Sequence, residues 1–175
     1  MDCPESSFKK LVIVGAGKIA EVAYRCFSTD GHREVVAFCV EDEFRDANVY
    51  LGLPLIPISE LKNSFPPESF DVFVAVGYQE INELRARLFS HCKDLGYSFG
   101  SYCSPASWRD ESFLVPNNFF LMASSVVQPG ATVEDNVFIF SGVTIGHHSR
   151  IRSHAWLASG VAIGGSVNLE RNCFL

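Results

Sequence analysis

Residues 115–175, VPNNFFLMASSVVQPGATVEDNVFIFSGVTIGHHSRIRSHAWLASGVAIGGSVNLERNCFL, follow a six-residue repeat. Every sixth position is aliphatic: Val115, Leu121, Val127, Val133, Ile139, Ile145, Ile151, Leu157, Ile163, Leu169 and Leu175. The residues four positions further on are nearly all small or β-branched. Neither a helix nor a simple strand has this period, which is typical of a parallel β-helix made of hexapeptides. Three hexads complete one triangular coil, so residues 18 apart are expected to stack.

The composition excludes several classes of protein. The chain has 175 residues, 47% of them hydrophobic, and a net charge of -6, which argues against nucleic acid as a partner because phosphates need a basic face. Its six cysteines lie far apart without a CxxC pair, which indicates reduced thiols rather than disulfides. The sequence has no signal peptide and no apolar run of the ~18 residues that cross a bilayer. We therefore expect a cytoplasmic protein with no membrane insertion.

The first hundred residues have the pattern of a Rossmann-like α/β unit. The apolar run 9–15 leads through Gly15 and Gly17 into a helical segment, as in folds that hold a phosphate at a helix N-terminus. A second strand is expected over 34–40 and ends in Glu41 and Asp42, acids that can bind a ribose or a base. A third strand is expected over 71–77, a helix over 80–93 and a last strand over 97–103.

The glycine turn has alternative interpretations. A tight turn that binds nothing would give the same pattern, and NAD is another possible ligand. About 100 residues precede the repeats, which is room for one small open sheet and not for the two halves that hold a dinucleotide. We therefore favour a single nucleotide or a nucleotide-sugar.

A change in composition marks the domain boundary. Residues 104–114 carry a proline and a charge cluster without a clear period, and only six charged residues follow between 115 and 175: Glu134, Asp135, Arg150, Arg152, Glu170 and Arg171. We expect a nucleotide-sugar-binding domain over 1–103 and a β-helix domain over 104–175. The low charge of the prism suggests faces buried against other copies in a homotrimer.

The hexad 145–150 carries the chemistry. His147 and His148 fall on its outer side, and Gly165, one coil later, should stack on His147. A neutral imidazole next to a bare backbone N–H suits acyl transfer: the ring removes a proton from an attacking amine or hydroxyl, and the N–H binds the oxyanion. A histidine pair without a role is the alternative.

A zinc site is a further alternative for the histidines. Zinc needs three or more converging ligands. His154 follows His147 by seven residues, about one side of the triangle away, and no other histidine lies a whole number of coils from these. The spacing therefore predicts no metal.

Four motifs together resemble the bacterial sugar O-acyltransferase family. They are VIVGAGKIAEVAY at 12–24, CVEDE at 39–43, FVAVGYQEINELRARL at 73–88 and the hexads with TIGHHS. The family includes sialic acid O-acetyltransferases and UDP-4-amino-sugar N-acetyltransferases. The resemblance covers almost the whole chain and implies a left-handed β-helix, a trimer and acetyl-CoA as co-substrate.

The resemblance also implies roles for individual residues. His147 matches the catalytic histidine, and Gly165 matches a glycine whose N–H meets the acetyl carbonyl. The nucleotide-contacting loops correspond to Gly15, Gly17, Lys18, Glu41, Asp42, Gly77 and Tyr78.

Three positions depart from the family pattern. His148 stands where members carry an acid, so another group must stabilise the imidazolium or the base is weaker. Trp156 occupies a position near the cofactor where several relatives have histidine. Ser104-Pro105 replaces a His-Pro pair at the domain junction.

The chain ends at Leu175 on a beat of the repeat, and uncapped coils expose open strand edges. Family members continue for several more hexads that complete the CoA groove. We therefore expect a C-terminally truncated form with weak or absent acetyl transfer.

These observations predict an acetyl-CoA-dependent N-acetyltransferase. Its expected substrate is the amino group of a nucleotide-linked amino-deoxysugar used for surface polysaccharide or glycan. A sugar O-acetyltransferase would use the same groups. A non-catalytic trimeric scaffold that binds a nucleotide-sugar is the alternative from another class.

Overall fold

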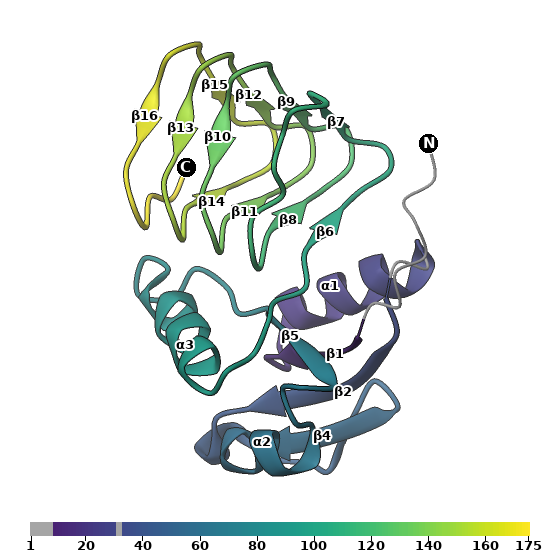
Figure 1. Cartoon of the computed structure of the whole chain (residues 1–175). Coiled ribbons are helices and arrows are strands. Elements are labelled where there is room, and N and C mark those ends of the chain that lie inside the picture. Colours follow the sequence, from purple (N-terminus) through teal and green to yellow (C-terminus); the bar gives the residue numbers. More distant parts are fainter. Residues whose placement is uncertain (1–8, 31–32) are drawn as a thin grey trace.

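A computed structural model describes residues 9–30 and 33–175, and Figure 1 shows its two units, a small α/β unit and a triangular coil of short strands. The coil is a left-handed parallel β-helix, and the α/β unit has the Rossmann-like parallel sheet. Both parts of the predicted fold class are confirmed.

The α/β unit is built on a five-stranded sheet with the order β3-β4-β2-β1-β5. All neighbours are parallel except β3 and β4. Helix α1 buries Ala20, Ala23 and Phe27 on one face, a helical spacing that packs it on the sheet. The elements are β1 (Lys10–Val14), α1 (Lys18–Thr29), β2 (Val35–Val40), β3 (Val49–Tyr50), β4 (Leu53–Pro57), α2 (Leu61–Ser64), β5 (Phe70–Val74) and α3 (Glu83–Asp94), with 3₁₀ turns η1 (Asp42–Phe44) and η2 (Ile58–Glu60).

Two local expectations about this unit are wrong. The helix expected from residue 80 begins at Glu83, because residues 80–82 form a left-handed turn. The strand expected over 97–103 does not join the sheet. A single bridge links Phe99 to Val72, and β6 (Tyr102–Cys103) pairs with a strand of the coil instead, since Tyr102 stacks on the coil's aromatic side chains.

The coil has three faces of two-residue parallel strands. Aliphatic side chains at the six-residue beat, such as Leu121, Ile139 and Ile151, point inward and are fully buried. The first face holds β6, β8 (Phe120–Leu121), β11 (Phe138–Ile139) and β14 (Trp156–Leu157). The second holds β7 (Trp108–Arg109), β9 (Val126–Val127), β12 (Thr144–Ile145) and β15 (Ala162–Ile163), and the third holds β10 (Thr132–Val133), β13 (Arg150–Ile151) and β16 (Asn168–Leu169).

The corners of the coil turn through left-handed backbone conformations. Positive φ recurs every six residues, at Asn118, Ser124, Gly130, Asn136, Gly142, His148, His154, Gly160, Ser166 and Asn172. Glycine and asparagine tolerate this region best, which explains their frequency in the series. These corner residues repeat every six positions in the sequence, as the aliphatic residues do.

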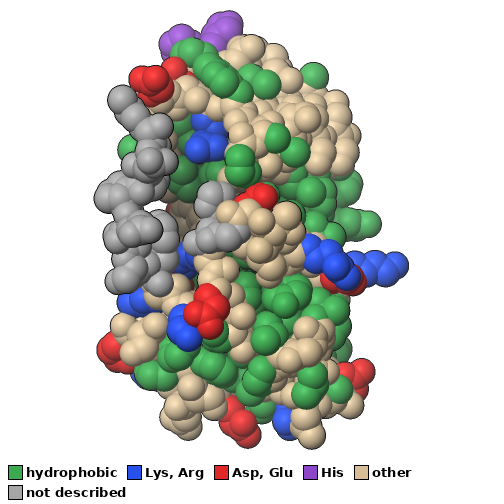
Figure 2. All heavy atoms as spheres, turned by 90° about the vertical axis from the view of Figure 1, so that its right-hand side faces the viewer, with side chains coloured by type: hydrophobic (Ala, Val, Ile, Leu, Met, Phe, Trp, Pro, Cys, Tyr) green, Lys and Arg blue, Asp and Glu red, His purple; other side chains and the backbone are tan. Residues whose placement is uncertain are grey.

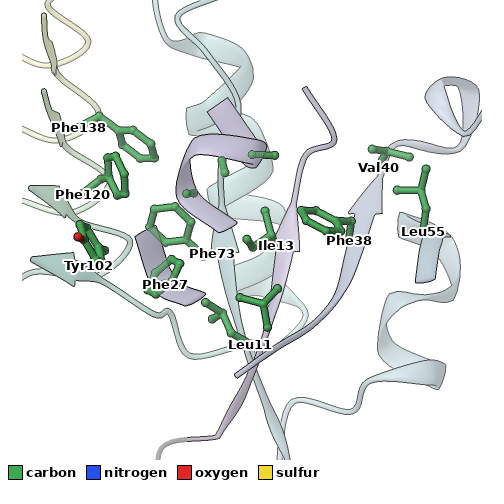
Figure 3. Packing of buried hydrophobic residues seen from close by; sticks show 14 of the residues in the cluster. Leu11, Ile13, Phe27, Phe38, Val40, Leu55, Phe73, Tyr102, Phe120 and Phe138 are labelled. Atoms are coloured by element: carbon green, nitrogen blue, oxygen red, sulfur yellow. The ribbon is translucent and has the colours of Figure 1, made fainter. Parts of the chain in front are cut away.

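An aromatic ladder on the first face joins the two units. Tyr102, Phe120, Phe138 and Trp156 lie one coil apart, in register on paired strands, and all are buried. Figure 3 shows Tyr102, Phe120 and Phe138 from the coil meeting Phe73 and Phe27 from the α/β unit. The Phe73 and Phe138 rings stack with centroids 5.6 Å apart. The first face therefore docks on the sheet unit and fixes how the coil stands on it.

Candidate active site

The glycine turn after β1 requires glycine at its first position. Gly15 has φ +129, and a Cβ atom there would stand 2.6 Å from the carbonyl oxygen of Ala75. Gly17 is the N-cap of the 12-residue helix α1 and gives it no side-chain cap, and a Cβ atom there would meet nothing within 4 Å, so the helix N-terminus is left open to a ligand. The turn therefore has the geometry of an anion-binding helix N-terminus.

A cavity of about 600 Å³ opens over this turn, at the carboxyl ends of β1 and β2. Of the residues expected on the nucleotide loops, Gly15, Gly17 and Glu41 line it. Most of the other residues that line this cavity were not predicted from the sequence: Ala16, Val40, Phe44, Asp46, Ala47, Val49, Tyr50, Leu55, Val76, Gln79, Leu84 and Leu88. Residues 44–50 have no motif or period that could have indicated them.

The two acids after β2 have different surroundings. Glu41 accepts a hydrogen bond from Arg87 of α3 at 3.1 Å, beside the cavity. Asp42 accepts hydrogen bonds from the backbone N–H and hydroxyl of Ser59, which lower the pKa of its carboxyl group. Asp42 is absent from the wall of the cavity, and its contacts tie η1 to η2.

A second cavity of about 460 Å³ continues from the first toward the coil. Lys18, Gly77 and Tyr78 line it, and both cavities share Gly17, Val76, Gln79 and Leu84. The Tyr78 ring lies against two aromatic side chains of the coil, with centroids 5.5 Å from Trp156 and 4.7 Å from Phe174. The predicted loop residues other than Asp42 therefore gather around one continuous hollow.

The structure brings His147 and Gly165 together, as predicted from the 18-residue length of one coil. A Cβ atom on Gly165 would stand 2.5 Å from His147 Nε2, so the imidazole fills the place of a side chain there. The backbone N–H of His147 donates to Gln128 Oε1 at 2.9 Å. Within residues 9–30 and 33–175, no hydrogen bond takes up the N–H of Gly165.

His148 is a corner residue with φ 57. Its Nδ1 lies 3.2 Å from Nδ1 of His147, close enough for one ring to donate and the other to accept. Its ring also lies over Gly130, where a Cβ atom would be 2.9 Å from Cδ2. Among the described residues no carboxylate hydrogen-bonds to either ring, so orientation is the contribution His148 can make.

Trp156 lies on another part of the coil from His147. Its ring is buried in the aromatic ladder, stacked on Phe138 at 5.4 Å with 10° between the planes, and Arg85 lies 5.3 Å from its centre. His147 stands at the corner between the second and third faces, opposite the first face. The structure therefore does not bring these two predicted residues together.

The histidine corner also lies away from the two cavities. The first face covers the α/β unit, and the corner after β12 is the edge of the coil furthest from that face, as Figure 1 shows. In Figure 2 the histidine side chains in view lie at the coil end of the molecule. One chain therefore holds the cavities and the histidine corner, the two half-sites of the candidate active site, on different sides of the molecule.

Across the described part of the chain, no three histidine, cysteine, aspartate or glutamate residues come together as metal ligands would. No helix among these residues is long and apolar enough to cross a bilayer.

The chain resembles known proteins in sequence over nearly half of its length and in structure over almost all of it. Residues 10–92 match the family described as the PglD N-terminal domain. The acetyltransferase domain of PglB from Neisseria gonorrhoeae has a similar structure, with a TM-score of 0.65 and 23% identity over 95% of this chain and 91% of that one. PerB from Caulobacter crescentus, solved with CoA and GDP-perosamine, gives a TM-score of 0.65 and 20% identity over 94% and 90% of the two chains.

WeeI from Acinetobacter baumannii has a TM-score of 0.64 and 14% identity over 91% of this chain and 74% of its own. A search of curated proteins gave no match. The predicted resemblance is thus confirmed: residues 10–92 match the PglD N-terminal domain, and the chain shares its fold with the acetyltransferase domain of PglB and with PerB.

Proposed function

We propose that this protein transfers an acetyl group from acetyl-CoA to the amino group of a nucleotide-linked amino-deoxysugar. The observation that carries the proposal is the imidazole of His147 lying against the bare backbone of Gly165, whose N–H has no other partner in the described residues. PglB is an acetyltransferase solved with acetyl coenzyme A, and PerB was solved with a nucleotide-sugar, which supports the same chemistry here.

The continuous hollow of the α/β unit suits a nucleotide-sugar. The base and ribose would occupy the larger cavity, with Glu41 near the ribose, and the phosphates would meet the N-terminus of α1 with Lys18 beside it. The sugar would then extend past Gly77 and Tyr78 toward the coil. The apolar wall and few polar groups of the hollow are typical of small-molecule sites.

The proposed chemistry needs no covalent enzyme intermediate. The sugar amine attacks the thioester carbon while His147 Nε2 takes its proton, which requires the other ring proton on Nδ1, donated to Nδ1 of His148. The Gly165 N–H stabilises the oxyanion. The tetrahedral intermediate then collapses and its C–S bond breaks. The CoA thiolate leaves and takes up the proton held by His147.

Acetyl-CoA would lie along the His147 corner, because the reacting carbonyl must meet the Gly165 N–H. The lack of a side chain at Gly165 lets the imidazole lie directly against the backbone whose N–H would meet the thioester carbonyl. This chain gives Trp156 no part in that contact, since its ring is enclosed in the aromatic ladder.

The opposed half-sites support a site shared between chains. In the proposed homotrimer, the sugar held by one α/β unit reaches His147 of a neighbouring copy. The outward residues of the second face, Trp108, Val126, Thr144 and Ala162, carry no charge, and Trp108 is 51% exposed, as expected of a face that packs on another copy. A cytoplasmic role in surface polysaccharide or glycan synthesis belongs to the same proposal.

A non-catalytic nucleotide-sugar scaffold is the second candidate. It is favoured by His148, because imidazole cannot stabilise an imidazolium as a carboxylate does. A sugar O-acetyltransferase differs only in the acceptor. Both are separated from the main proposal by the assay below.

The test mixes the protein with acetyl-CoA and a panel of UDP-, dTDP- and GDP-linked sugars, with and without an amino group, and follows the free thiol of CoA. Calorimetry measures the binding of each nucleotide-sugar. We expect one amino-sugar to react, and His147→Ala to lower the rate by ~10²–10⁴-fold, the usual contribution of a general base. Full activity of His147→Ala would exclude it as the base. Nucleotide-sugar binding without CoA release would favour the scaffold, and reaction of sugars that lack an amine would favour O-acetylation.

A further inference from the structure

Arg85 of α3 is fully buried between the two units and has no carboxylate partner in the described residues. Its guanidinium donates to the backbone oxygen of His154 at 2.6 Å and lies 4.7 Å from the centre of the Phe138 ring. Burial lowers the pKa of Arg85 to about 9, which leaves the group charged at neutral pH. A buried cation satisfied by backbone oxygens and aromatic faces is costly to maintain, which suggests a specific task.

Arg85 also holds the turn that precedes α3. Its Nη1 donates to Asn82 Oδ1 at 2.9 Å. The Asn82 amide in turn donates to the backbone oxygens of Asn172 and Cys173, at 2.9 and 3.2 Å. The turn is therefore tied to the same corner of the coil in two successive coils, at His154 through Arg85 and at Asn172 through Asn82.

That turn has an unfavourable backbone. Glu80, Ile81 and Asn82 have φ values of 52, 51 and 67, three consecutive residues in the left-handed region. Asparagine tolerates this conformation, but a β-branched residue such as Ile81 rarely adopts it. Such a segment persists only where its surroundings over-determine it. Here those surroundings are the ties to the coil.

The turn lies next to the sugar end of the hollow. Tyr78 and Gln79 immediately precede it and line the second cavity, and Leu84, two residues after it, lines both cavities. The Asn82 N–H donates to the backbone oxygen of Tyr78 at 3.3 Å, so the position of Tyr78 depends on the turn. Among the described residues, no hydrogen bond joins Arg85 or Asn82 to Gly15 or Glu41 at the base and ribose end.

We propose that Arg85 is a positioning residue: by fastening the Glu80–Asn82 turn to the coil, it sets Tyr78 and Gln79 for the sugar of the nucleotide-sugar. This inference rests on the proposed function for the identity of the ligand. It makes the sugar end of the hollow a joint product of both units, whereas the nucleotide end belongs to the α/β unit alone.

Three variants test the proposal. Arg85→Met keeps an unbranched side chain and removes the charge and the donors. Asn82→Gly accepts the left-handed backbone and removes only the side-chain ties, so it remains informative if the buried Arg85 variant fails to fold. Arg25→Met on α1 is the matched control, because Arg25 is exposed and pairs only with Glu21.

Calorimetry measures binding of a nucleoside diphosphate and of the amino-sugar linked to it. For Arg85→Met and Asn82→Gly we expect the nucleotide-sugar to bind about tenfold more weakly or worse, with the free diphosphate within about twofold of wild type. The KM for the nucleotide-sugar should rise with kcat largely kept, and Arg25→Met should change nothing. Equal losses for both ligands, or wild-type sugar binding by the folded variants, would overturn the proposal.

Amide hydrogen exchange separates this inference from the proposed function. The backbone N–H groups at positions 82 and 83 should exchange faster in both variants without any ligand, since the turn loses its ties. Unchanged exchange would refute the fastening role. Faster exchange in a protein that binds none of the nucleotides or nucleotide-sugars would instead refute the proposed function.

Discussion

Gly165 leaves a space that the imidazole of His147 fills, and this pair is the chemical centre of the proposed site. The approach of 2.5 Å between a hypothetical Cβ atom and His147 Nε2 means that any larger residue must push the ring away. Gly164, its neighbour in the chain, is different, because a Cβ atom there would meet nothing closer than Val167 Cγ2 at 3.9 Å. A substitution at Gly164 is therefore a suitable control for the same substitution at Gly165.

Gly165→Ala should lower kcat for acetyl transfer by ~10²-fold or more, because a displaced base loses its alignment with the attacking amine. Steady-state kinetics with CoA release as the signal measures this. Gly164→Ala should stay within about threefold of wild type. Similar rates for both variants would contradict the assigned role of the His147–Gly165 contact.

His154 is a buried corner residue whose ring Nδ1 lies 2.7 Å from the Asn136 amide. Burial, with Arg171 and Arg85 nearby, lowers the pKa of His154 to about 4. The neutral ring therefore accepts the amide N–H and belongs to the same polar series of corners as Asn118 and Asn136.

The folded protein should lose stability as the pH falls from about 6.5 to about 4, because the unfolded chain takes up a proton at His154 that the folded chain resists. The slope from this residue is at most about 1.4 kcal/mol per pH unit. Urea unfolding across this range measures it. His154→Asn, which restores the residue found at other corners, should flatten the slope, and an unchanged slope would assign the effect to other groups.

Among the elements, the aromatic ladder of the first face decides how the units join. Phe138 stacks on Phe73 from β5 and on Trp156 from β14, and Arg85 lies over its ring. Figure 3 shows this cluster continuing into the core of the sheet unit. The coil and the sheet therefore share one hydrophobic core rather than a thin interface.

Phe138→Ala should lower the free energy of unfolding by ~3–5 kcal/mol, the usual cost of removing a buried aromatic ring. Denaturant unfolding followed by circular dichroism checks this. Phe44→Ala removes a ring that is 61% exposed and should cost much less, within about 1 kcal/mol. Equal losses would mean that the ladder does not hold the units together.

At the scale of the whole molecule, the two half-sites of one chain face different directions. A shared active site predicts that two different inactive variants can complement each other. His147→Ala removes the base, and Gly17→Asp puts a carboxylate at the helix N-terminus that is expected to hold phosphate, without steric strain because a Cβ atom there meets nothing.

Each variant alone should be inactive. In the proposed homotrimer, unfolding and refolding an equal mixture should regain about a quarter of wild-type activity, because one pairing in four joins an intact pocket to an intact neighbouring histidine. The thiol assay measures the recovery. Separately refolded variants, combined afterwards without exchange, are the control. No recovery in the mixed trimers would show that pocket and base belong to the same chain.

Much of this arrangement follows from sequence periods. The six-residue beat predicts the coil, its 18-residue turn predicts the His147–Gly165 contact, and the glycine turn predicts where the hollow opens. Regular spacing can be read along the chain because each repeat meets its neighbour in the same way. The aromatic ladder repeats every 18 residues and the corner residues repeat every six, so both could have been predicted from the sequence too.

Other features depend on contacts between segments far apart in the chain. No period indicates that Phe44 and Tyr50 line the cavity, that Trp156 faces the sheet unit, or that Arg85 reaches His154 across 69 positions. By itself, the sequence determined the coil, the glycine turn and the stacked His147–Gly165 pair, since these rest on local or repeating geometry. Only the tertiary structure decided which face of the coil docks on the sheet, and hence that one chain's cavity and histidine point apart, because that choice depends on packing between the two units.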